Sequence, residues 1–100
     1  MIFVSGQIAI DPASNNMVLD NIADETHQVM KNIGEILKTV EMTYSNIIKT
    51  TIFLKDMNQF VQVNEIYGSY FKSDFPARET VQVSRLPKDV SVEISVIATK

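Results

Sequence analysis

The sequence predicts an α+β domain in which two helices pack on one face of a mixed β-sheet. Two segments carry apolar residues at helical spacing, and four others alternate as strands do. Their order is strand, helix, strand, helix, strand, strand. Because the chain has 100 residues and neither repeats nor a Gly/Ser/Pro-rich linker, we expect one domain over residues 1–100.

The first strand is expected within Ile2–Ile10, followed by a polar turn at residues 11–16. A helix is predicted over Ile22–Met42, because its apolar residues recur at spacings of three, four and seven. This apolar stripe consists of Ile22, Val29, Met30, Ile33, Ile36, Leu37 and Val40. The first turn carries residues that favour a helix N-terminus, with Asp20 or Asn21 as the cap and Asp24 and Glu25 beside it.

A second strand is predicted at Ile47–Leu54, with Ile48, Ile52 and Leu54 on one face. Asp56 is expected to cap a second helix over Met57–Phe71. Its inward stripe is predicted to consist of Met57, Phe60, Val61, Asn64, Tyr67, Gly68 and Phe71.

The sequence Asp74-Phe75-Pro76 ends the second helix and leads to a strand over Thr80–Ser84, with Val81 and Val83 on one face. After a turn at residues 86–89, the last strand alternates most clearly. Its core face is expected to carry Val90, Val92, Ile94 and Val96.

A sheet with helices on one side must give its second face to water or to a partner. That second face is expected to carry Lys49, Thr51, Phe53, Thr80, Gln82, Ser84, Ser91, Glu93, Ser95 and Ile97. This set is too apolar for free solvent and too polar for a sealed core, so we expect a subunit interface that contains a wet pocket.

Composition argues against several kinds of partner and cofactor. A net charge of −3 without a basic stripe disfavours nucleic acid as a partner. The longest apolar run, Met1–Val4, is far short of a membrane span, and no secretory or transit segment is recognisable, so we expect a cytoplasmic protein. Without cysteine, with a single histidine and without a glycine-rich phosphate loop, neither a metal site nor a cofactor is expected.

Two charged residues stand out. Arg78 opens a strand directly after Phe75-Pro76-Ala77, and its guanidinium suits bidentate capture of a carboxylate. An exposed ion pair with Asp74 or Glu79 explains it equally well. Glu93, in the last strand, could shuttle protons, although composition alone favours a structural pair with Lys49 or an arginine.

Two weaker candidates complete the set, and His27 is not among them. Asn64 is the polar member of the second helix's stripe, where it satisfies backbone groups or contacts a ligand. Ser5-Gly6 forms either a bulge or a turn whose backbone faces a ligand. His27 lies beside the apolar stripe of the first helix and is expected on the solvated surface.

Several segments together resemble the Rid family of reactive-intermediate deaminases, also called the YjgF/YER057c/UK114 or endoribonuclease L-PSP family. The resemblance covers nearly the whole chain. Its motifs are Ser5-Gly6-Gln7-Ile8, Lys49–Asp56, Val63–Tyr67, Phe75-Pro76-Ala77-Arg78, Arg85-Leu86-Pro87-Lys88-Asp89 and Val92-Glu93-Ile94.

The resemblance implies a chorismate-mutase-like homotrimer with clefts between subunits. It also implies cofactor-free hydrolysis of 2-aminoacrylate-type enamines and imines to 2-keto acids and ammonia. Arg78 would hold the substrate carboxylate, and Glu93 would activate water or shuttle its proton. The pocket lining implied by the family consists of Ser5, Gly6, Asn64 and Thr80.

Three departures from the family pattern are visible. Glu79 replaces a small residue beside Arg78, and it would weaken anion binding if it turned inward. Thr80 stands where Cys is common, which excludes thiol chemistry. Family members carry a further edge strand, with a cleft tyrosine, before the position of Met1, so the chain as written is expected to lack it. A non-catalytic module that binds small carboxylates in the same cleft is the alternative function.

Overall fold

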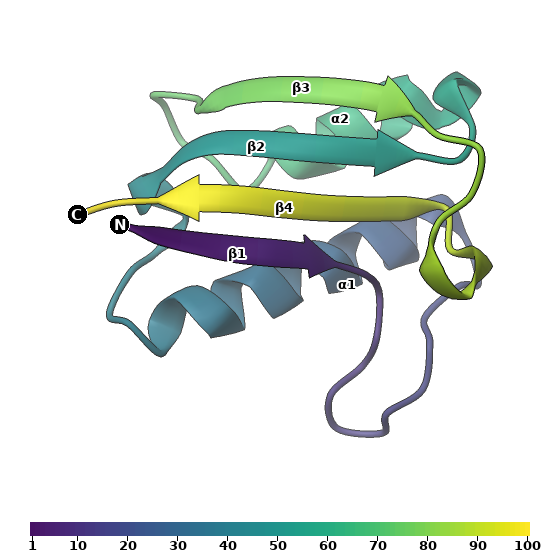
Figure 1. Ribbon diagram of the computed structural model, residues 1–100, viewed down its shortest axis with the longest axis horizontal. Helices are drawn as coiled ribbons and strands as arrows, with labels where there is room; N and C mark the ends of the chain where they lie inside the picture. The colour runs from purple at the N-terminus through teal and green to yellow at the C-terminus, as the bar shows by residue number, and fades with distance from the viewer.

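Four strands form one mixed sheet in the computed structural model, which describes residues 1–100. The strands are β1 (Ile2–Gln7), β2 (Ile47–Leu54), β3 (Ala77–Gln82) and β4 (Val92–Ala98), in the spatial order β1-β4-β2-β3. β4 is antiparallel to β1 and β2, whereas β3 is parallel to β2. Both helices, α1 (Ile22–Lys38) and α2 (Phe60–Gly68), lie behind the sheet in Figure 1. The predicted fold class is confirmed, and the sheet has a covered helix face and an open face.

The core lies between α1 and the helix face of the two central strands. In β4 the alternation is strict, and Val92, Ile94 and Val96 are buried as predicted. Burying each such side chain contributes about 1.5–3 kcal/mol, so β4 and α1 anchor the fold. The buried apolar residues of α1 are Ile22, Val29, Met30, Ile33 and Leu37.

α1 begins as expected and ends earlier than expected. The side-chain oxygen of Asn21 accepts the N–H of Asp24 at 2.8 Å, so Asn21 is the cap. The helix stops at Lys38 because the chain turns back before Met42, and Glu41 adopts a φ of 59° there. Neither α1 nor α2 has the length and apolar composition that crossing a membrane requires.

The predicted orientation of Ile48 is wrong: its side chain is exposed. The register between β2 and β4 shifts at this point, because Ile47 pairs with Ala98 and Lys49 already pairs with Ile97. Such a bulge reverses the alternation locally. Ile47 and Thr50 are therefore buried, together with the correctly predicted Ile52 and Leu54.

The second helix is also displaced from its predicted stripe. It starts as a 3₁₀ turn, η2 (Met57–Gln59), whose first turn is capped by the Asp56 carboxylate, and α2 follows. Val63 and Tyr67 are buried, whereas Met57 and Val61 are exposed. Residues two apart on a helix lie about 200° apart around it, so Val61 cannot face the sheet together with Val63.

The predicted faces of β3 are wrong as well. Thr80 pairs with the buried Ile52, and Gln82 with Leu54, so both lie on the helix face, and Val81 lies on the open face. The helix face carries polar residues here because β3 is an edge strand. The Gln82 side-chain oxygen accepts the N–H of Met57 at 2.8 Å, whereas the Thr80 hydroxyl has no partner within the chain.

Candidate functional site

Arg78 lies on the helix face of β3, where two aromatic rings of α2 hold its guanidinium. The guanidinium carbon is 5.4 Å from the centre of the Phe60 ring and 5.9 Å from that of Tyr67. Contacts of this kind attract the cation to the rings while its N–H donors stay available. The alternative ion pair with Asp74 or Glu79 is absent: Arg78 pairs with neither, and Glu79 points to the open face, where it pairs with Lys49 at 3.0 Å. Glu79 therefore does not compete for Arg78 within its own chain.

A hollow of about 500 Å³ opens beside Arg78, between α2 and the segment that leads into β3. It is lined by Asn64, Glu65, Tyr67, Gly68, Phe75, Pro76 and Arg78. Asn64 is half-buried and makes no hydrogen bond through its side chain, so its amide remains available to a ligand in this hollow.

Tyr67 fixes the position of this hollow on the sheet. Its hydroxyl donates to the Thr50 hydroxyl of β2 at 2.8 Å, and both side chains are buried. Burial raises the pKa of Tyr67, although the Thr50 hydrogen bond and the nearby Arg78 charge lower it in part. Tyr67 is therefore neutral near pH 7 and serves as a rigid platform under Arg78.

Thr80 follows Arg78 on the same face of β3. Its hydroxyl oxygen is buried and has no hydrogen-bond partner. An unpaired buried hydroxyl costs about 1–3 kcal/mol. Thr80 is not among the residues that line the hollow beside Arg78.

Glu93 lies on the open face of β4, beside the Ser5-Gly6 segment of β1. Between Val4 and Gln7, β1 advances one residue more than β4, so Ser5-Gly6 is a β-bulge. A Cβ at Gly6 would lie 2.7 Å from the carboxyl carbon of Glu93, which shows how closely the bulge approaches this side chain.

Glu93 is half-buried and forms no ion pair. The structural alternative, a pair with Lys49 or an arginine, is therefore not what the chain adopts. Lys49 pairs with Glu79, and Arg85 forms a two-bond pair with Asp89 at 2.7 and 3.2 Å. The Glu93 carboxylate is thus available for chemistry.

The six predicted site residues divide into two groups on opposite faces of the sheet. Asn64, Arg78 and Thr80 lie on the helix side at the β3 edge. Ser5, Gly6 and Glu93 lie on the open face at the β1–β4 pair. A single chain does not bring the two groups together; the family resemblance places all six in a cleft between subunits.

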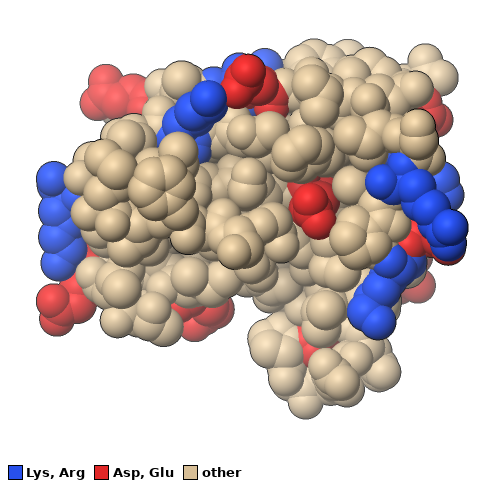
Figure 2. All heavy atoms as spheres, viewed as in Figure 1, with Lys and Arg blue, Asp and Glu red and all other residues tan.

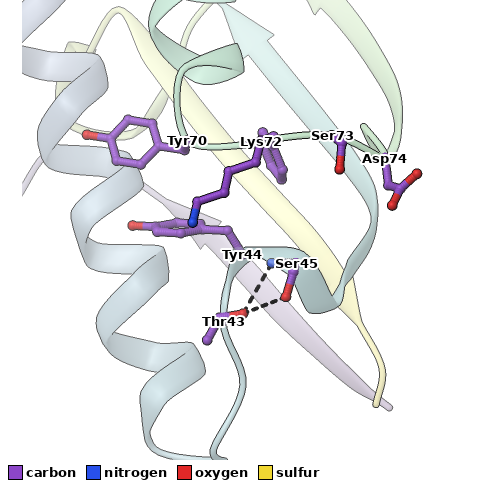
Figure 3. A pocket seen from close by; sticks show the side chains of 8 residues that line it. Thr43, Tyr44, Ser45, Tyr70, Lys72, Ser73 and Asp74 are labelled. Carbon is purple, nitrogen blue, oxygen red and sulfur yellow. Dashed lines mark hydrogen bonds between the residues drawn. The ribbon is translucent and has the colours of Figure 1, made fainter.

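A second hollow, of about 460 Å³, lies between η1 (Tyr44–Asn46) and the segment after α2. Figure 3 shows the rings of Tyr44 and Tyr70 directed toward α1. The ring centres are 5.2 Å apart, and Lys72 lines the same hollow. The expectation of a solvated His27 is wrong: it is half-buried, and its Nδ1 lies 2.7 Å from the Tyr70 hydroxyl. No sequence pattern indicates that His27, Tyr44 and Tyr70 lie together, because these residues come from three separate segments.

Fold and site define a small α+β protein that presents an unpaired guanidinium, suited to a carboxylate ligand, and an unpaired carboxylate. The chain belongs to the family described as endoribonuclease L-PSP, whose pattern it matches over residues 1–100. This match confirms the resemblance to the Rid family.

Relatives are similar in both sequence and structure. The human 2-iminobutanoate/2-iminopropanoate deaminase is 50% identical over 97 residues, which are 97% of this chain and 71% of the human protein. The Rid-family protein YyfA of Yersinia pestis superimposes with a TM-score of 0.95 at 48% identity, over 98% of this chain and 79% of YyfA. Escherichia coli TdcF with bound serine gives a TM-score of 0.93 at 36% identity, with 98% and 79% covered.

Proposed function

We propose that this chain is a deaminase that hydrolyses 2-aminoacrylate-type enamines and imines, such as 2-iminobutanoate and 2-iminopropanoate, to 2-keto acids and ammonia. The observation that carries the proposal is the Arg78 guanidinium, which is held over two rings at the mouth of a hollow without an acidic partner. Sequence identity of 50% to the human deaminase supports the same reaction.

The complete site is proposed to form between copies of a homotrimer. The separation of Arg78 and Glu93 onto opposite faces supports an intersubunit cleft, in which Arg78 of one copy meets Glu93 of the next. The open face supports association too, because it exposes Phe3 (73%) and Val81 (43%) and carries the half-buried Phe53 and Ile97. Figure 2 shows this face as largely uncharged, with most charged side chains toward its margins.

Within this cleft, Arg78 would bind the substrate carboxylate through two parallel N–H donors and thereby fix the imine carbon. Glu93 would accept a proton from water as the water oxygen bonds to that carbon. Glu93 then returns this proton to nitrogen, which gives a carbinolamine. In a second transfer it carries the remaining hydroxyl proton to nitrogen while the C=O bond forms and the C–N bond breaks, so that ammonia and the keto acid leave. Imine plus water equals keto acid plus ammonia, so no electrons are exchanged and the chemistry requires no cofactor.

The remaining predicted residues would complete the binding of substrate. The Asn64 amide, which lines the same hollow as Arg78, would lie beside the bound carboxylate, and Thr80 follows Arg78 on the same face of β3. The Ser5-Gly6 bulge would face the reacting carbon together with Glu93, because a glycine backbone permits close approach. Thr80 offers a hydroxyl where a thiol is common in the family, and hydrolysis of an imine needs no thiol.

The test is the release of ammonia and keto acid from 2-aminoacrylate generated in situ, with spontaneous hydrolysis measured in parallel. We expect the wild type to accelerate the reaction and Arg78→Ala to abolish the acceleration. Glu93→Gln should abolish turnover while it retains binding of a 2-keto acid. Wild-type protein that binds keto acid without turnover would instead support the non-catalytic binding module.

A nuclease function, which the family description names, is not supported by the charge distribution. Phosphate recognition needs clustered Lys and Arg, and the chain has a net charge of −3 without such a cluster in its sequence. The cytoplasm remains the compartment that we propose for the enzyme.

A further inference from the structure

Glu25 lies in the first turn of α1, and its side chain is buried in the core. A favourable interaction with the helix N-terminus does not explain why it is buried. Its residue is only 2% exposed, and no cation lies within ion-pair distance. One carboxylate oxygen accepts the backbone N–H of Ser91 at 2.8 Å and that of Val92 at 3.1 Å. Because one side-chain oxygen accepts both backbone N–H groups, this contact ties α1 to the start of β4.

The two N–H groups need this acceptor because the sheet does not supply one. β1 pairs with β4 no further than Gln7 and Ile94, so no strand lies beside Val92 on that side. On the other side, the Ser91 carbonyl accepts the N–H of Lys55 at 3.0 Å. Glu25 therefore occupies the place of a strand partner at the point where β1 has ended.

The segment before β4 is held by the buried side chains of Leu86 and Val90, and its backbone is strained between them. It contains two consecutive residues in the left-handed region, Lys88 (φ 55°) and Asp89 (φ 54°), which is an unfavourable conformation for side chains of this kind. Its Arg85–Asp89 ion pair is exposed and contributes little. Glu93 follows this segment directly, and its carboxylate must lie within a few tenths of an ångström of its working position.

We propose that Glu25 is a positioning residue for Glu93: it anchors the backbone at Ser91 and Val92, and thereby holds the Glu93 carboxylate against the Ser5-Gly6 bulge. The inference rests on the proposed function in so far as Glu93 activates water. The geometry behind the inference lies within one chain: the buried Glu25 carboxylate accepts the N–H of Val92, the residue before Glu93.

Two substitutions separate anchoring from packing. Glu25→Gln retains an oxygen acceptor, whereas Glu25→Met retains the length of the side chain and loses the acceptor. We expect Glu25→Gln to keep kcat within about twofold of wild type, and Glu25→Met to lower kcat at least about tenfold with KM changed less than about twofold, because the Arg78 group is untouched.

Thr26→Val is the matched control. Thr26 is fully buried on the same helix, and its hydroxyl donates to the Ile22 carbonyl within α1 at 2.7 Å. This variant removes a buried hydrogen bond of α1 that does not reach β4, so kcat should be retained. A folded, associated Glu25→Met protein with wild-type kcat would overturn the inference, and so would a Thr26→Val protein whose kcat falls equally.

A readout that does not need turnover keeps the inference separate from the proposed function. The ¹³C NMR chemical shift of the Glu93 carboxyl carbon, assigned with Glu93→Gln, should change in Glu25→Met and stay unchanged in Glu25→Gln. If the wild type shows no turnover, the proposed function fails, and this chemical shift alone decides on Glu25. An unchanged chemical shift in Glu25→Met would then refute the positioning role.

Discussion

Gly6 and Glu93 are so close that position 6 has no room for a side chain. A Cβ there would lie 2.7 Å from both the carboxyl carbon and one carboxylate oxygen of Glu93. Gly6 does not have a positive φ, so its backbone conformation does not demand glycine. Space is the reason for glycine here, and the bulge of β1 therefore restricts where the Glu93 carboxylate can lie.

Gly6→Ala is expected to displace the Glu93 carboxylate and to lower kcat about tenfold or more. The free energy of unfolding should change by less than about 1 kcal/mol, because the atom that must move is the far end of a flexible side chain. Steady-state kinetics and urea unfolding measure the two quantities. Unchanged kcat in a folded Gly6→Ala protein would show that Glu93 does not work from its observed position.

Gly34→Ala is expected to have the opposite profile. Gly34 lies under Tyr44, whose hydroxyl donates to the Met30 carbonyl at 2.7 Å, and a Cβ at Gly34 would lie 2.9 Å from the Tyr44 ring carbon that bears the hydroxyl. Displacing Tyr44 should lower the free energy of unfolding by about 1–3 kcal/mol in spite of the better helix propensity of alanine. Turnover per folded molecule should stay at the wild-type level. A loss of kcat would instead link the second hollow, which Tyr44 lines, to the reaction.

Stability is expected to fall in alkali through Tyr44. Burial, followed by the charges of Tyr70 and Glu35, raises the pKa of Tyr44 from 10.0 to about 12. Because the folded protein holds this proton more tightly, the contribution is complete below pH 10.0 and is lost as the pH rises to about 12. The difference in unfolding free energy between wild type and Tyr44→Phe should therefore shrink over this interval in urea titrations. A constant difference would contradict the burial argument.

Ile97→Lys is expected to prevent association. Ile97 lies in the open face between Phe3 and Lys49, where a second lysine would bring an unpaired charge into the proposed interface. Light scattering should show a monomer, and turnover should disappear although Arg78 and Glu93 are intact. Val61→Lys on α2, a position 66% exposed, serves as control and should leave assembly and turnover unchanged. An active Ile97→Lys monomer would refute a site shared between copies.

The sequence correctly predicted those parts of the fold in which apolar and polar residues are clearly separated onto different faces. The last strand alternates valine and isoleucine with polar residues, so its faces followed directly. β3 has only one bulky apolar residue, Val81, and its orientation depends on pairing with β2, which no local pattern reveals. The bulge at Ile48 is likewise a property of the β4 register.

The sequence predicted which residues belong to the candidate site, but not how they lie relative to one another. Arg78 and Glu93 follow from motif and residue type, but their separation onto opposite faces depends on strand register. Glu25 was interpreted as a partner of the helix dipole. Its spacing of three from Ile22 and four to Val29 places it on the apolar stripe, and that spacing could have revealed its burial.

The most direct test of a shared site is to co-express Arg78→Ala and Glu93→Gln chains and to assay the mixed oligomers. Each variant alone should be inactive. In randomly mixed oligomers, about a quarter of the clefts would combine an intact Arg78 from one copy with an intact Glu93 from the next. We therefore predict recovery of about a quarter of wild-type turnover. Mixed oligomers without any recovered turnover would contradict the account, because they would show that both residues must come from the same chain.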